Sequence, residues 1–182
     1  VNVDLKAFTE KFYWKLTGAH MQPVLDTLEY IKHETDTWLE ITTLLIPGKN
    51  DSGEELDAMT RWVTDHLGAD VPIHFSAFHP DWKMRDVPAT PPETLSRARM
   101  IALANGIHYA FTGNVHDEDG ESTYCHHCGE KLIGRDWYVM TEWHLDSNAC
   151  CKHCGTHVAG VFEENPGTWG ARRQPVQLAS YD

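Results

Sequence analysis

The chain has 182 residues and a formal net charge of −12 when its histidines are counted as neutral. Nucleic acids and anionic membranes are held by clustered Lys and Arg, so this charge argues against both as general partners. No apolar run approaches the roughly 18–20 residues of a membrane-spanning helix, and no signal-peptide pattern stands at the start. The totals predict one globular domain, or one domain with a small satellite.

Strand and helix patterns alternate along the first part of the chain. Apolar, β-branched runs predict strands over residues 1–8, 38–46, 71–78 and 107–113. Apolar residues at helical spacing predict helices over 22–34, 52–68 and 90–104, with a short turn or helix over 9–17. In the second of these helices, Ser52 and Glu55 form a capping box and Gly68 closes the last turn.

Each predicted crossover is long enough to return the chain to a parallel register, so the fold class is α/β with four parallel strands. Two architectures fit this pattern. One is a four-stranded layer that stands alone, and the other is a partial (βα) barrel that lacks its first strands. Because residues 1–8 (VNVDLKAF) are already a strand pattern at the first residue, we favour the partial barrel.

The composition becomes acidic and polar over residues 116–123, where we place a domain boundary. We expect residues 1–115 to form the α/β part and residues 121–162 to form a small β unit. Residues 163–182, rich in Gly, Pro and Arg, are expected to be an extended tail.

The cysteines predict a metal site in the small β unit. Cys125 and Cys128 form one CxxC pair, Cys151 and Cys154 form another, and a glycine follows each pair. Two such turns separated by a β-hairpin make the four-thiolate site of a zinc ribbon, with iron as the alternative ion. We expect the hairpin over 131–145, with its turn at 134–136.

Other side chains near the pairs are weaker candidates for ligands. Cys150 lacks the CxxC spacing and is interpreted as a spare thiol. Neighbouring histidines are expected to balance thiolate charge or to face solvent: His126, His127, His144, His153 and His157. Cysteines clustered in CxxC pairs are typical of a reducing compartment, so we expect a cytoplasmic protein.

Polar residues follow the first and third predicted strands. Asp4 and Lys6 lie at the end of the first strand, and His79 follows the third. The carboxyl ends of parallel strands meet at one rim, where βα folds bind ligands, so these three side chains are expected to converge there. Each of them taken alone is more typical of an ordinary surface or core residue than of a ligand-binding one.

The chain resembles a known family in the order of its motifs. VNVDLKAF, EITTLLIPGKND, HFSAFHP and the TYCxxCG segment together look like the activating enzymes of the pyruvate formate-lyase type, in the radical S-adenosylmethionine (SAM) superfamily. The subgroup called AmmeMemoRadiSam enzymes, which end in a four-cysteine ribbon, is the most similar. The resemblance implies that Asp4, Lys6 and His79 help to hold SAM, and that a protein substrate loses a hydrogen atom to a 5′-deoxyadenosyl radical.

The sequence departs from this family in one large respect. The CxxxCxxC loop that binds the family's [4Fe–4S] cluster is absent from these residues, as is the glycine-rich stretch that grips SAM. We therefore expect this chain to be the C-terminal portion of such an enzyme, inactive alone, with SAM and [4Fe–4S] bound only in the full-length parent. Residues 1–8 would then be the fourth barrel strand, and its open edge predicts self-association.

A non-enzymatic function is the alternative. A zinc ribbon on a small α/β layer is also typical of a protein-interaction module. The aromatic residues of the ribbon, Trp137, Tyr138 and Trp143, favour that reading.

Overall fold

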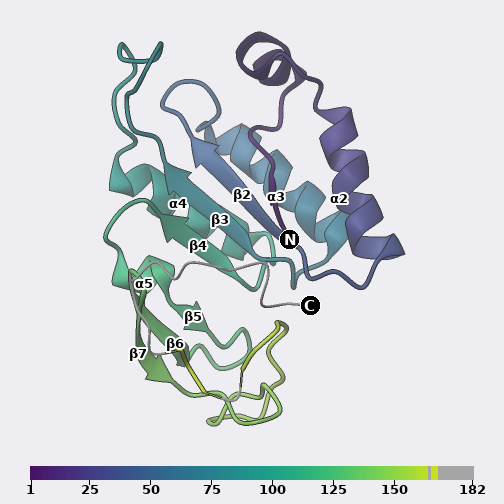
Figure 1. Cartoon of the computed structure of the whole chain (residues 1–182), viewed down its shortest axis with the longest axis vertical. Helices are drawn as coiled ribbons and strands as arrows, with labels where there is room; N and C mark the ends of the chain where they lie inside the picture. Colours follow the sequence, from purple (N-terminus) through teal and green to yellow (C-terminus); the bar gives the residue numbers. More distant parts are fainter. Residues whose placement is uncertain (164, 168–182) are drawn as a thin grey trace, which may run out of the picture.

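The computed structural model describes residues 1–163 and 165–167. Two sheets organise them: a four-stranded sheet with the order β1-β2-β3-β4 and a three-stranded sheet with the order β5-β6-β7 (Figure 1). The tail predicted over 163–182 lies, apart from residues 163 and 165–167, outside the described residues. Within the described part of the chain, no helix is both long and apolar enough to cross a membrane.

The first sheet is parallel throughout, as predicted. Its strands are β1 (Asn2–Asp4), β2 (Glu40–Leu45), β3 (Ile73–Ala77) and β4 (Ala110–Gly113). The crossovers contain α2 (Gln22–Glu34), α3 (Gly53–Leu67) and α4 (Pro92–Ala104), and the short turn or helix is α1 (Glu10–Phe12) followed by the π-helix η1 (Tyr13–Thr17). The mixed α/β architecture with four parallel strands is therefore confirmed, and the partial barrel stays a prediction.

Burial alternates strictly along the strands and separates two faces of this sheet. The first face is fully buried and packs on α2, α3 and α4 through residues such as Ile41, Ile73 and Phe75. The second face is only half-buried and consists of the alternate residues: Glu40, Thr42, Leu44, His74, Ser76 and Phe111. Parallel sheets are ordinarily covered on both faces, so the second face is where this fold has room for other elements.

β1 lies at the edge of the sheet and pairs only with β2 among the described residues. Its outer backbone groups are therefore available to another strand. Self-association through this edge stays a prediction.

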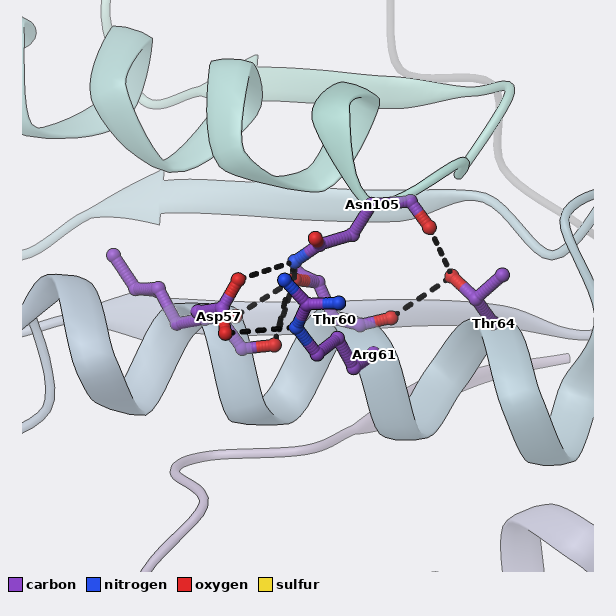
Figure 2. Close-up of polar contacts among 6 residues, drawn as sticks. Asp57, Thr60, Arg61, Thr64 and Asn105 are labelled. Atoms are coloured by element: carbon purple, nitrogen blue, oxygen red, sulfur yellow. Dashed lines mark hydrogen bonds and ion pairs between the residues drawn. The ribbon is translucent and has the colours of Figure 1, made fainter.

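A polar network joins the two helices that flank β3. Ser52 caps α3 as predicted, by accepting a hydrogen bond from the Glu55 N–H (3.2 Å). The reciprocal half of the capping box is not formed, because the Glu55 carboxylate accepts from the Phe8 N–H (2.8 Å) instead. At the end of α4, the Asn105 amide donates to the Asp57 carboxylate (2.9 Å) and to Thr60 Oγ1 (2.8 Å), as Figure 2 shows. Thr64 Oγ1 closes the network by donating to the Asn105 carbonyl (3.1 Å). These bonds fix the end of α4 on the side of α3.

Asn105→Ala should lower the free energy of unfolding by about 1–2 kcal/mol, because Thr60 and Asp57 lose a shared donor. Arg61→Ala is the matched control, since Arg61 contacts the same Asp57 carboxylate from an exposed position (2.8 Å) and exposed pairs add little. Urea unfolding of both variants is the measurement. Equal effects of the two substitutions would contradict this role of Asn105.

The second sheet belongs to the small β unit, which we call the ribbon (residues 121–162). After the short helix α5 (Glu118–Glu121), its strands are β5 (Thr123–Tyr124), β6 (Lys131–Asp136) and β7 (Val139–Trp143). The hairpin is confirmed, but the turn predicted at 134–136 is wrong. β6 runs through these residues and the chain turns at Trp137 and Tyr138, where Trp137 has a φ of 53°.

Gly134 explains this error. It lies inside β6 at a register shift, where a Cβ atom would lie 2.4 Å from Thr141 Oγ1 on β7. The glycine is therefore needed for close contact between the strands at a bulge, and not for a turn.

The ribbon packs against the β4 side of the first sheet, below β4 in Figure 1. Tyr109, just before β4, shares a buried cluster with Leu132, Ile133 and other ribbon residues. Its hydroxyl lies 3.2 Å from His126 Nδ1 and accepts a hydrogen bond from the Ala159 N–H (3.3 Å). Burial raises the pKa of Tyr109 to about 12, so the hydroxyl keeps its proton at this junction. The boundary over 116–123 stays a prediction.

Candidate functional site

Two tight turns bring the four cysteines of the CxxC pairs together. In the first turn the Gly129 N–H donates to the Cys125 carbonyl (2.9 Å), and in the second the Gly155 N–H donates to the Cys151 carbonyl (2.8 Å). Both glycines have a φ of 77°, a conformation that L side chains rarely adopt. The glycines thus permit the turns that aim both pairs at one point, as the sequence predicted.

The sulfur atoms have the spacing of a single tetrahedral metal ion. Cys125 Sγ lies 3.6 Å from Cys154 Sγ, Cys128 Sγ lies 3.8 Å from Cys151 Sγ, and all four lie within 4.8 Å of one another. Four sulfurs about 2.3 Å from a central ion lie about 3.8 Å apart, so this group is able to bind one metal ion.

Thr156 favours the thiolate form of Cys154 without joining the group. A hydrogen bond with Thr156 Oγ1 (3.3 Å) lowers the pKa of Cys154 to about 5. A hydrogen bond from the Glu130 backbone lowers the pKa of Cys128, but burial and the neighbouring thiols outweigh it and raise that pKa to about 12. Cys150 lies outside the group, with its Sγ 3.5 Å from the Asn148 carbonyl. In the described part of the chain no histidine belongs to the group either.

We expect the purified chain to bind one metal ion per molecule and Cys128→Ser to lose it, because three thiolates leave the tetrahedron incomplete. Cys150→Ser is the matched control and should keep the ion. Metal analysis after gel filtration measures both. Loss of the ion from the Cys150 variant, or its retention in the Cys128 variant, would show that the ligand set is wrong.

A cleft of about 740 Å³ lies between the second face of the sheet and the ribbon. The sheet contributes residues of β2, β3 and β4 to its walls, and the ribbon contributes residues of β6, the hairpin turn and β7. Seven Trp, Tyr and Phe side chains line the cleft among the described residues: Trp38, Tyr109, Phe111, Trp137, Tyr138, Trp143 and Phe162. A cavity of this size and lining is typical of a small-molecule site.

A carboxylate–imidazole pair lies on the sheet side of the cleft. Glu40 Oε2 is 3.0 Å from His74 Nε2 on the neighbouring strand, and Glu40 Oε1 accepts a hydrogen bond from Trp38 Nε1 (2.9 Å). The bond with His74 holds the pKa of the Glu40 carboxyl below its ordinary value. The His74 ring also stacks on Phe111, with ring centroids 5.0 Å apart.

Arg135 lies on the ribbon side of the cleft and is half-buried. Its Nη1 donates to the Glu121 carbonyl (3.1 Å) and to Thr123 Oγ1 (2.7 Å), and its guanidinium lies 5.7 Å from the centre of the Phe111 ring. Burial lowers the pKa of the guanidinium from its ordinary value, but an arginine still keeps its proton at physiological pH. The ribbon thus presents a fixed positive charge to the sheet.

The hairpin turn beside the cleft is held by an ion pair. Asp136 Oδ1 lies 2.9 Å from His116 Nε2, and the His116 ring stacks on Trp137 with centroids 6.4 Å apart. The hydrogen bond to Asp136 raises the pKa of His116 above its ordinary value of 6.5. The stabilisation from this pair is therefore complete below pH 6.5 and is lost as the pH rises through the folded-state pKa.

An NMR titration should give His116 a pKa above 6.5. Asp136→Asn should bring that pKa down toward the ordinary value, because the hydrogen-bonded charge is lost. Glu118→Gln is the control and should lower it less, since Glu118 acts only through its charge at a distance. A His116 pKa that is insensitive to Asp136→Asn would contradict the pair.

The structure brings together two of the three residues predicted to converge at the rim. Lys6 Nζ lies 2.9 Å from Asp4 Oδ2. Asp4 is opposite Thr42, which is opposite His74, so His74 is level with Asp4 in the sheet register. His79 lies five residues after His74 in the chain. Its side chain is exposed and has no hydrogen bond or ion pair to another described residue. A role of these three residues in holding SAM stays a prediction.

Sequence reasoning missed Glu40, Phe111 and Arg135 as site residues. In β2, half-buried Glu40, Thr42 and Leu44 alternate with fully buried residues, so Glu40 lies on the second face of the sheet. This alternation was the sequence signal that could have identified Glu40. Arg135 was missed because the sequence pattern predicted it to lie in the hairpin turn, whereas it lies in β6.

A comparison with curated proteins finds a longer relative. No protein-family model matches the sequence. Over 159 residues the chain is 41% identical to uncharacterized protein MJ0808 of Methanocaldococcus jannaschii, covering 87% of this chain and 47% of that protein. The chain therefore spans about half the length of this curated relative.

Two solved structures are similar in fold. A domain of pyruvate-formate lyase-activating enzyme from Bacteroides vulgatus matches with a TM-score of 0.54 and 16% identity, covering 62% of this chain and 66% of that one. A radical SAM methyltransferase from Sphaerobacter thermophilus matches with a TM-score of 0.51 and 19% identity, covering 61% of this chain and 32% of that one. The chain thus shares the α/β fold of these two structures, and its described residues also contain a four-cysteine group.

Proposed function

We propose that this chain is the C-terminal portion of a radical SAM enzyme of the activating-enzyme type. The full-length protein would cleave SAM to a 5′-deoxyadenosyl radical and abstract a hydrogen atom from a partner protein. The observation that carries this proposal is the likeness of the fold to an activating-enzyme domain and to a radical SAM methyltransferase. The half-length match to a longer relative agrees with it.

The four-cysteine group does not fit the iron–sulfur cluster of this chemistry. SAM cleavage needs a cluster with three cysteines and one open iron, whereas the sulfurs here have the spacing of one ion held by four thiolates. We propose that the ion is a structural zinc, with iron as the alternative, since four thiolates suit both. The [4Fe–4S] cluster would lie elsewhere in the full-length protein.

This chain would contribute the SAM-holding rim. Asp4, the last residue of β1, and Lys6, just after it, form an exposed ion pair. A carboxylate is able to accept from ribose hydroxyls, and an ammonium is able to meet the methionyl carboxylate. His79 follows β3 at the same end of the sheet. These roles come from the family resemblance, and the ion pair supports them.

A second candidate function is a zinc-ribbon module for protein contacts. The observation that favours it is the exposed aromatic hairpin turn, where Trp137 is 52% exposed and Tyr138 is 66% exposed. Exposed aromatic side chains are enriched at protein interfaces. This function would be compatible with an enzyme as the parent, but it requires no SAM.

The test is anaerobic reconstitution of the full-length protein with iron and sulfide, followed by dithionite, SAM and chromatography for 5′-deoxyadenosine. We expect the full-length protein to form 5′-deoxyadenosine and the 182-residue chain to form none. Asp4→Asn should weaken SAM binding about tenfold through loss of charge-assisted hydrogen bonds.

Asp36→Asn removes the same charge from an exposed loop and should leave SAM binding unchanged. A reconstituted, iron-loaded full-length protein that neither binds nor cleaves SAM would overturn the proposal and leave the interaction module.

A further inference from the structure

We propose that the cleft between the second face of the sheet and the ribbon is a binding site for a small organic anion with an aromatic or apolar body, whose carboxylate is held by Arg135. The site would belong to this chain itself, whether or not the parent protein cleaves SAM.

The size and lining of the cleft fit such a ligand. Its volume of about 740 Å³ lies within the range of about 300–1,000 Å³ that small-molecule sites occupy. Trp38 and Phe111 come from the sheet side, and Trp143 and Phe162 from the ribbon side. A flat apolar body between these walls would bury surface that the protein alone leaves partly open.

Arg135 is a charged group in the cleft that has unused hydrogen-bond donors. Nη1 is fully engaged by the Glu121 carbonyl and Thr123 Oγ1, which fixes the guanidinium. In the described part of the chain, no acceptor binds Nε or Nη2 and no carboxylate lies within 4.0 Å of the guanidinium. A half-buried cation without a paired anion is costly, so a ligand carboxylate would relieve that cost and form a two-pronged contact.

Two of the three acidic side chains that line the cleft among the described residues, Glu40 and Glu121, are already engaged, and the third, Glu163, is exposed. Both Glu40 oxygens are bonded, one to His74 and the other to Trp38. Glu121 accepts from the Trp137 N–H (2.9 Å) and, at the limit of hydrogen bonding, from the Asp117 N–H (3.5 Å). These carboxylates therefore have less capacity to bind a cationic ligand than Arg135 has to bind an anion.

The surroundings of Arg135 hold it ready for a ligand. Its guanidinium lies over Phe111, which is itself stacked on His74, and its backbone N–H donates to Ser122 Oγ (3.1 Å). In the same wall, the buried Trp143 Nε1 has no acceptor among the described residues. A fixed guanidinium and an unsatisfied buried donor both belong to the lining of this cleft, and an oxygen-bearing anion would pair with the guanidinium.

Three probes that share one body and differ in charge test this proposal: 3-phenylpropionate, 3-phenylpropylamine and 3-phenylpropanol. Each is titrated into the metal-loaded, isotope-labelled chain, and dissociation constants come from NMR shifts. We expect 3-phenylpropionate to shift the signals of Phe111, His74 and Arg135. It should bind about tenfold more tightly than the alcohol, and the amine should bind most weakly.

Arg135→Gln should weaken binding of the acid about tenfold and leave binding of the alcohol unchanged, while Arg135→Lys should keep part of the preference. Lys131→Gln is the matched control, because it removes one charge from the same strand outside the cleft. The metal content and melting temperature of each variant check its fold.

The proposal is overturned if no probe binds, if the amine binds as tightly as the acid, or if Arg135→Gln keeps the preference for the acid. The first two outcomes are read from the unmodified chain, so they hold even if the Arg135 variants fail to fold. No outcome depends on radical chemistry, so failure here and failure of the proposed function are distinguishable.

Discussion

The constraint on which this structure depends is that every long helix lies on one face of the parallel sheet. The crossovers place α2, α3 and α4 against the fully buried face, where Ile41, Ile73 and Phe75 pack. The alternate residues then form a second face of mixed character that none of these three helices covers. At its Leu44 end this face packs against the cluster that contains Phe12 of α1 and Tyr13 of η1. A parallel sheet with such a face needs another element beside it, and over β3 and β4 that element is the ribbon.

The ribbon is small, and its own apolar core is limited. Its buried cluster contains only a few aliphatic side chains, together with two of the cysteines and Tyr109 from the sheet. Structural metal ions in small domains contribute on the order of 10 kcal/mol of folding free energy. The four-thiolate group is therefore expected to determine whether β6 and β7 hold Arg135 over Phe111, and so whether the cleft exists.

Much of the fold was predictable because its signals are local. Ser52 and Glu55 predict the start of α3, and the CxxCG turns predict the metal site. The alternation in EITTLL predicts a strand with two unlike faces. The hairpin turn was not predictable from Gly134, since the glycine is needed for contact with Thr141 on the partner strand. The meeting of Arg135 with Phe111 depends on how the ribbon docks, which no local pattern contains.

The site at the rim shows the same limit. Asp4 and Lys6 are close in sequence, and their ion pair follows from the strand. His79 was grouped with them because it ends the third strand pattern, but the register places His74 level with Asp4. Strand register is set by pairing along the whole sheet. The sequence therefore shows which residues lie near the ends of the strands, but not which residues of neighbouring strands lie opposite one another.

The most direct measurement is hydrogen–deuterium exchange of the chain with its metal bound and after removal of the metal by a chelator under reducing conditions. The account predicts that amides of β6 and β7 lose protection when the metal leaves, while those of β2 and β3, which belong to the other core, keep theirs. Protection of the ribbon amides without metal, or loss of protection in β2 and β3 at the same time, would contradict it.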